Sequence, residues 1–294
     1  MIKIISNILL GRKQVQIMSD KELRRAIIVH NHLFKNAGTS IDWALKKNFG
    51  RNFIDHRNDE LMLKGAGFLG PYLQENDDIY ALSSHHLTLP LPKLENTKLL
   101  HLMMFRHPIE RVTSVYNYER KQTSSSTPGA VHARKLTLRD YILWRMEKNV
   151  GPTIRNFHVI RSIPLRKNVK MRVTEAEAQM ALESIQSIPL LGMVEKFDES
   201  MVLFQETLRQ YFPSIDLSYK MQNINQDKRT TQKERIAKLH EEIGDEAFQI
   251  LLDKNKYDLA LYESVTQEFQ SRQMNILDIL SKLQDFRTRC ARHK

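Results

Sequence analysis

Two strand–loop–helix units constrain the fold of this chain more than any other feature of its sequence. In the first, the apolar run 26–29 precedes a polar segment, residues 30–40, and then apolar residues at helical spacing. In the second, the apolar run 98–105 ends at Arg106 and leads into a helix whose first turn suits Pro108. Repeated units of this kind predict a parallel sheet covered by helices.

The rest of the chain extends this pattern and then changes it. Residues 79–83 and 190–194 read as further strands, whereas Thr174 and Glu177 form a capping box that predicts a helix to about residue 187. The final seventy or so residues indicate two or three amphipathic helices. We therefore predict an α/β fold of three layers, similar to P-loop proteins, with a central, mainly parallel sheet flanked by helices and a helix-rich C-terminal half.

Charge and cysteine usage limit the class of protein. The chain has 45 Lys and Arg against 34 Asp and Glu, a net charge of +11, which predicts attraction to a polyanion without choosing among nucleic acid, anionic membrane, acidic polysaccharide and phosphorylated cofactor. Its one cysteine, Cys290, cannot form an intrachain disulfide, so a reducing compartment fits best. The apolar stretch 4–10 is too short to span a bilayer, and we expect no stable membrane insertion.

The loop after the first strand has the parts of a phosphate cradle. It follows a strand, leads into a helix N-terminus and carries Lys35, Gly38, Thr39 and Ser40. Its spacing is not that of a Walker A loop, G-x-x-x-x-G-K-[ST], in which the lysine follows the glycines, because Lys35 precedes Gly38, the only glycine of this loop. The alternative is an ordinary strand-to-helix turn without a ligand.

The second unit adds another candidate anion site. Arg106 stands at the carboxyl end of its strand and Ser114 about two turns into the next helix, and open α/β sheets bind ligands at that edge. Two anion-binding elements on neighbouring strands suggest a ligand with two separated phosphates. A surface ion pair for Arg106 and a solvated position for Ser114 are the alternatives.

The residues of both units resemble the sulfotransferases. Residues 35–40 resemble the 5′-phosphosulfate loop of that family, and residues 106–116 resemble its 3′-phosphate motif, R-x-P-x-x-R-x-x-S-x-Y. Residues 190–200 and 255–263 are similar to later blocks of the carbohydrate branch, which includes the heparan sulfate 2-O-sulfotransferases. The four matches occur in order, and they imply an N-terminal extension over 1–25, a single sulfotransferase-like domain over 26–270, and a C-terminal helix and basic tail over 271–294.

The resemblance implies binding of 3′-phosphoadenosine-5′-phosphosulfate (PAPS) as co-substrate, without a metal. Lys35 would stabilise the leaving 5′-phosphate, and Arg106 and Ser114 would hold the 3′-phosphate, whereas Arg111 is open between that phosphate and a structural ion pair. The implied cofactor-binding set is Lys35, Asn36, Ala37, Gly38, Thr39, Ser40, Arg106, Ser114 and Arg111.

Transfer to a hydroxyl needs a general base, and two histidines end the strand at 79–83. The family carries its base in the pattern G-H-x-x-[FY]; His86 matches it better, His85 occupies the glycine position, and His30 and His32 rank second. Arg155 lies in a segment that resembles one near the family's acceptor.

The resemblance implies a sulfotransferase acting on a carbohydrate hydroxyl. Members of the family that act in the Golgi have a membrane anchor and lumenal cysteines, and this sequence shows neither, so we expect a soluble, bacterial, cytoplasmic enzyme. The acceptor can be anionic, no nucleic-acid partner is expected, and the oligomeric state is open. The competing hypotheses are a nucleotide-dependent kinase or NTPase and a non-catalytic module that binds polyanions.

Overall fold

The computed structural model describes residues 25–164, 172–220 and 230–293. Nearly all of the predicted N-terminal extension, residues 1–24, lies outside this range, as does Lys294. Within it, five strands form one sheet in the order β2-β3-β1-β4-β5, and every neighbouring pair is parallel. The strands are β1 (Arg25–Asn31), β2 (Phe53–Asp55), β3 (Ala81–Ser84), β4 (Thr97–Phe105) and β5 (Leu190–Met193).

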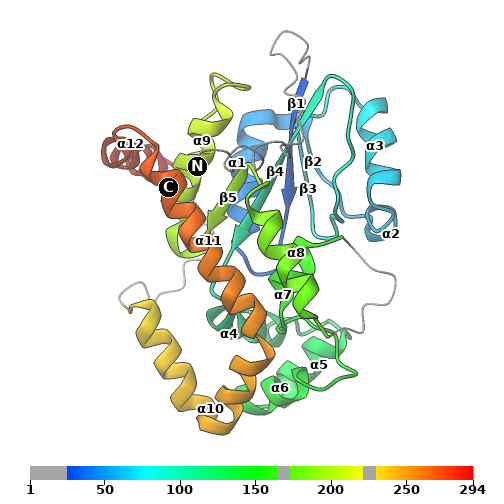
Figure 1. Cartoon of the computed structure of the whole chain (residues 1–294), viewed down its shortest axis with the longest axis vertical. Helices are drawn as coiled ribbons and strands as arrows, with labels where there is room; N and C mark the ends of the chain where they lie inside the picture. The colour runs from blue at the N-terminus through cyan, green and yellow to red at the C-terminus, as the bar shows by residue number, and fades with distance from the viewer. Residues whose placement is uncertain (1–24, 165–171, 221–229, 294) are drawn as a thin grey trace, which may run out of the picture.

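Helices cover both faces of the sheet, so the predicted three-layer α/β fold is confirmed (Figure 1). On one face, Ile41 of α1 (Gly38–Phe49), Phe204 of α9 (Phe197–Leu208) and Phe286 of α12 (Ile279–Ala291) pack in one core cluster against Ile28 of β1. The other face is covered by α2 (Asp59–Met62), α3 (Ala66–Glu75), α7 (Phe157–Ser162), α8 (Glu175–Ile185) and α11 (Lys256–Met274).

A separate group of helices lies beyond the carboxyl ends of the strands. It consists of α4 (Pro108–Arg120), α5 (Pro128–Lys135), α6 (Leu138–Arg145) and α10 (Gln232–Lys254), which share their own apolar cluster. Figure 1 shows this group at the lower end of the molecule, below the sheet. This group forms a wall facing the edge where the loops after the strands emerge. The predicted helix-rich C-terminal half is confirmed by α7 to α12, between which β5 is the one strand of the described residues.

The order of the strands identifies the point where a ligand is expected. The chain leaves β1 toward the β2 edge of the sheet and leaves β4 toward the β5 edge, so the connections diverge between β1 and β4. Open α/β sheets bind ligands in the crevice at such a switch point. The loop after β1 and the residues after β4, where both predicted phosphate sites lie, therefore face one crevice.

The strands predicted at 26–29, 79–83, 98–105 and 190–194 correspond to β1, β3, β4 and β5, with bounds that differ by at most two residues. The capping box at Thr174 and Glu177 is present and starts α8. The short strand β2 and the helices α2 and α3 were not predicted, because β2 has only three residues and they become progressively more exposed. No helix in the described part of the chain is long and apolar enough to cross a membrane.

Candidate active site

The loop after β1, residues 32–37, is held in an unusual backbone conformation. Lys35 and Ala37 have φ angles of 64° and 61°, in the left-handed region that non-glycine residues rarely enter. Ala37 is also the N-cap of α1, and its methyl group cannot accept a hydrogen bond from the first-turn N–H groups. The N–H group of Ser40 donates to the carbonyl oxygen of Ala37 at 3.2 Å, whereas no hydrogen bond within the described residues uses the N–H groups of Gly38 and Thr39, which are available to an anion. Strained residues of this kind cluster at binding sites.

A cavity of about 1340 Å³ opens beside this loop and brings most of the predicted cofactor residues together. Its walls come from the loop and α1 on one side, α4 and α10 on another, and the residues after β5. The predicted residues among its lining are Lys35, Ala37, Thr39, Ser40, Arg106 and Ser114.

Two cations of this cavity lie close together. An Nη1 of Arg106 donates a hydrogen bond of 3.2 Å to the carbonyl oxygen of Lys35, and its Nε has no hydrogen-bond partner among the described residues. Burial lowers the pKa of Arg106 although Glu195 and Glu110 act against it. Burial also lowers the pKa of Lys35, and the nearby charges of Arg106 and Lys121 add to that effect. A bound anion would oppose these effects, so the charges fit a phosphate or sulfate group.

Tyr118 is a cavity residue that the sequence did not single out. The Nζ of Lys35 lies 4.6 Å from the centre of its ring, which places the ammonium over an aromatic face. Arg120, the last residue of α4, and Lys121 after it also line the cavity, as do Arg235 and Lys238 of α10. No motif marked these residues, because their contribution depends on how α4 and α10 pack.

Arg111 and Asn36 are predicted cofactor residues that do not line the cavity. Arg111 is buried; its guanidinium donates to the carbonyl oxygens of Phe34 and Thr153 and lies 4.0 Å from the ring centre of Phe157. Burial lowers its pKa to about 9, against the attraction of Asp258. These contacts make Arg111 a support for the loop.

Asn36 supports the loop in a similar way. Its Nδ2 donates 2.7 Å to the carbonyl oxygen of Met104 in β4 and lies 2.8 Å from Nε2 of His158. The side chain therefore ties the loop after β1 to the neighbouring strand. Arg155, the predicted acceptor contact, donates instead to the carbonyl oxygens of Met146, Glu147 and Val150, and it is not among the cavity residues.

Gly38 is required by a side chain inside the protein. A Cβ at this position would lie 2.1 Å from Cδ2 and 2.3 Å from Nε2 of His32. The sequence suggested that Gly38 lets the backbone approach an anion; the structure adds that its missing side chain makes room for an imidazole.

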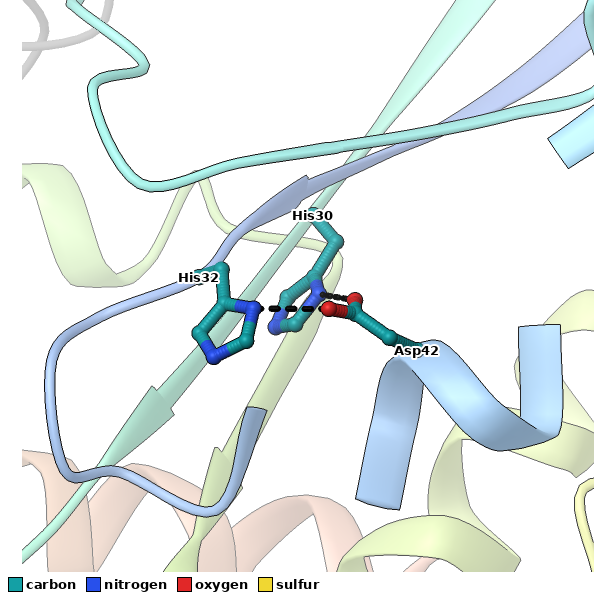
Figure 2. Close-up of side chains that lie close together, drawn as sticks. All are labelled: His30, His32 and Asp42. Atoms are coloured by element: carbon teal, nitrogen blue, oxygen red, sulfur yellow. Dashed lines mark hydrogen bonds and ion pairs between the residues drawn. The ribbon is translucent and has the colours of Figure 1, made fainter. Parts of the chain in front are cut away.

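That imidazole belongs to a group of three side chains drawn in Figure 2. Asp42 of α1 lies 2.8 Å from Nδ1 of His30 and 2.7 Å from Nδ1 of His32, one carboxylate oxygen to each ring. Burial alone would raise the pKa of Asp42, but the charge of His30 and hydrogen bonds from both histidines outweigh it, and the pKa falls well below its usual range.

These three residues also have the donor atoms of a metal site, and the distances bear on that possibility. Ligand atoms of a tetrahedral zinc ion lie about 3.3 Å apart. The separations of 2.7 and 2.8 Å are shorter and are those of hydrogen bonds. The arrangement therefore fits a carboxylate that orients two imidazoles.

The two predicted base residues are neighbours in sequence with different surroundings. His85 donates from Nδ1 to the carbonyl oxygen of His32 at 2.8 Å, and its ring centre lies 4.0 Å from that of His32. Burial lowers its pKa to about 4, and His32 adds to the effect. His86 is 3.1 Å from a carboxylate oxygen of Asp59 at the start of α2. Both follow the end of β3, and neither lines the cavity.

Residues of the two later sequence blocks meet the motif that follows β4. The carboxylate of Glu195 accepts from the backbone N–H of His107 at 2.8 Å and from the hydroxyl of Tyr262 at 2.9 Å. Asp258 accepts from the N–H groups of His158 and Val159 at the start of α7. Segments widely separated in sequence are thus linked by hydrogen bonds around one crevice.

The chain was compared with family models and with known proteins. No family model matches the chain. The chain is 31% identical over 267 residues to an uncharacterized protein of Archaeoglobus fulgidus, and the match covers 84% of this chain and 99% of that protein.

Proposed function

We propose that this chain, which belongs to the same family as the uncharacterized Archaeoglobus fulgidus protein, is a sulfotransferase that moves a sulfonate group from PAPS to a carbohydrate hydroxyl. One observation carries the proposal: Lys35, Thr39 and Ser40 of one motif and Arg106 and Ser114 of another line the same cavity at the switch point of the sheet. A donor with a phosphosulfate and a separate 3′-phosphate matches that pair of sites.

The main contribution of the protein to this reaction would be to stabilise negative charge. The acceptor oxygen forms a bond to sulfur while the bond from sulfur to the bridging oxygen of the 5′-phosphate breaks, and that oxygen keeps the electron pair. The transition state is expected to be loose, as in phosphoryl transfer. Lys35 and the first N–H groups of α1 would stabilise the charge on the leaving phosphate, while Arg106 and Ser114 hold the 3′-phosphate.

The acceptor proton passes to a neutral imidazole in this scheme. His85 donates its Nδ1 proton to a carbonyl oxygen, so its Nε2 carries the lone pair that a base needs. His86 is the better match to the family pattern, and His85→Asn and His86→Asn variants separate the two candidates. We further propose that the enzyme acts in the cytoplasm, where its single cysteine stays reduced.

Calorimetry tests the donor assignment. We expect 3′-phosphoadenosine-5′-phosphate to bind the wild-type chain at least tenfold more tightly than ATP with magnesium. Lys35→Ala and Arg106→Ala should each weaken the bisphosphate roughly 10- to 100-fold, the cost of a hydrogen bond to a charged group. Lys46→Ala, an exposed lysine in the last turn of α1, is the matched control and should leave binding unchanged.

The same experiment distinguishes the competing functions. Preference for ATP with magnesium would favour a kinase or NTPase, and equal or absent binding of the two nucleotides would refute the sulfotransferase. Incubation with ³⁵S-labelled PAPS and a panel of carbohydrate acceptors then measures transfer directly.

A further inference from the structure

Asp42 of α1 links this helix to strand β1 and to the loop that follows β1. It lies one turn into α1, the helix that begins at the loop after β1, and its two oxygens reach His30 at 2.8 Å and His32 at 2.7 Å (Figure 2). The carboxylate is largely buried, with 13% of its side chain exposed. A largely buried carboxylate that accepts a hydrogen bond from one imidazole with each of its two oxygens fixes the orientation of both rings.

The hydrogen bonds also determine where the protons are. An ionised carboxylate only accepts hydrogen bonds, so Nδ1 of both His30 and His32 must carry a proton. A carbonyl oxygen likewise only accepts, so the bond from His85 to His32 requires a proton on Nδ1 of His85. Each of the three imidazoles, when neutral, therefore has its lone pair on Nε2.

His32 transmits this arrangement to its surroundings. Its backbone N–H donates 3.0 Å to the carbonyl oxygen of Ser84, and its own carbonyl accepts from His85. Its ring fills the space beside Gly38, at the first residue of α1. Because the ring of His32 lies 4.0 Å from that of His85, a change in its tilt would shift the imidazole of His85.

We propose that Asp42 is a positioning residue that holds His30 and His32 as Nδ1–H tautomers and, through His32, sets the placement of His85 relative to the loop that binds the donor. The inference rests on the proposed sulfotransferase function for its kinetic consequence. Its structural part, the tautomers, does not depend on that function.

Asp42→Asn is the sharpest perturbation, because it keeps the shape and changes the hydrogen bonding. An amide has one oxygen that accepts and one NH₂ group that donates, so one of the two histidines must move its proton from Nδ1 to Nε2. We expect ¹⁵N spectra of labelled histidine to show this change of tautomer. Misplacement of a reacting group by about 1 Å costs on the order of 100-fold in rate, so kcat should fall roughly 10- to 100-fold.

Donor binding provides the contrast with a general structural defect. Because Asp42 does not line the cavity, the affinity for 3′-phosphoadenosine-5′-phosphate should stay within about threefold of wild type while kcat falls. Asp245→Asn is the matched control: Asp245 forms a 2.7 Å pair with His240 on α10, is almost fully exposed, and should leave kcat and donor affinity unchanged.

Three results would overturn the inference. The first is a wild-type ¹⁵N spectrum in which neutral His30 or His32 carries its proton on Nε2. This measurement uses the wild-type protein and so does not depend on whether a variant folds. The second is an Asp42→Asn enzyme as active as Asp245→Asn. The third is a fall in donor affinity as large as the fall in kcat. Failure of the wild-type chain to bind the bisphosphate at all would refute the proposed function instead, and the tautomers would still test the role of Asp42.

Discussion

Substitution of Gly38 by alanine tests whether this glycine is required by His32. The backbone at Gly38 is helical, and alanine in a helix is normally more stable than glycine by up to about 1 kcal/mol. The new Cβ would lie 2.1, 2.3 and 2.6 Å from Cδ2, Nε2 and Cγ of His32. Because Cγ is one of these atoms and Asp42 holds the ring at 2.7 Å, rotation of the imidazole cannot relieve the contact.

The magnitude follows from these opposing effects. Overpacking of a filled site costs about 1 to 3 kcal/mol, and three contacts this short favour the upper end. After subtracting the gain in helix propensity, we expect Gly38→Ala to lower the free energy of unfolding by about 2 kcal/mol. In a chain that already carries His32→Ala, the clash is gone, and the same substitution should raise the free energy of unfolding by up to about 1 kcal/mol.

Urea denaturation of the four proteins in this cycle measures the effect, with fluorescence and circular dichroism checked for coincident transitions. The coupling energy between positions 32 and 38 should be about 3 kcal/mol. A Gly38→Ala protein as stable as wild type, or an equal loss of stability in both backgrounds, would refute the steric role of His32.

Two further predictions concern buried groups. Arg111→Ala should lower the free energy of unfolding, measured in urea, by about 3 kcal/mol, because the carbonyl oxygens of Phe34 and Thr153 lose a buried charged donor. In calorimetry it should weaken binding of the bisphosphate less than Arg106→Ala does. The reverse order would make Arg111 a ligand of the 3′-phosphate. Burial, and then His30, lowers the pKa of His101 from 6.5 to about 4, so the unfolded chain binds the extra proton first as pH falls. Wild type should therefore lose about 2 kcal/mol more stability than His101→Leu between pH 7 and pH 5, and equal losses in the two proteins would contradict this assignment.

The sequence predicted the centre of the fold and one wall of the site, for identifiable reasons. β1 and β4 are nearly continuous apolar runs because both faces of a parallel sheet are covered, and such runs stand out from their polar flanks. Lys35 and Arg106 could be placed near each other because each lies in the segment that follows one of these strands. Strand β2 has no such apolar run, since it has only three residues and the last of them is exposed.

The remaining site residues depend on packing that no local pattern specifies. Arg106 and Arg111 belong to one motif, but α4 turns the second into the protein, where backbone carbonyls take its donors. His85 and His86 are adjacent in sequence, and only the fold shows that His85 bonds the carbonyl oxygen of His32 whereas His86 pairs with Asp59. Asp42 stands between apolar helix residues and has no sequence signal, because its partners lie 10 and 12 residues earlier, on β1 and its loop.

The central place of β1 in the sheet has a consequence for synthesis. Its partners are β3 and β4, so neither edge of this buried strand can pair until the ribosome has made the roughly 50 further residues that complete β3, on the order of 3 to 10 seconds at ordinary rates of translation. For that interval the strand that later carries the cradle is an apolar segment with both edges open, which is where self-association would begin. A holdase that binds residues 25–31 on the nascent chain would protect the step on which the active site depends.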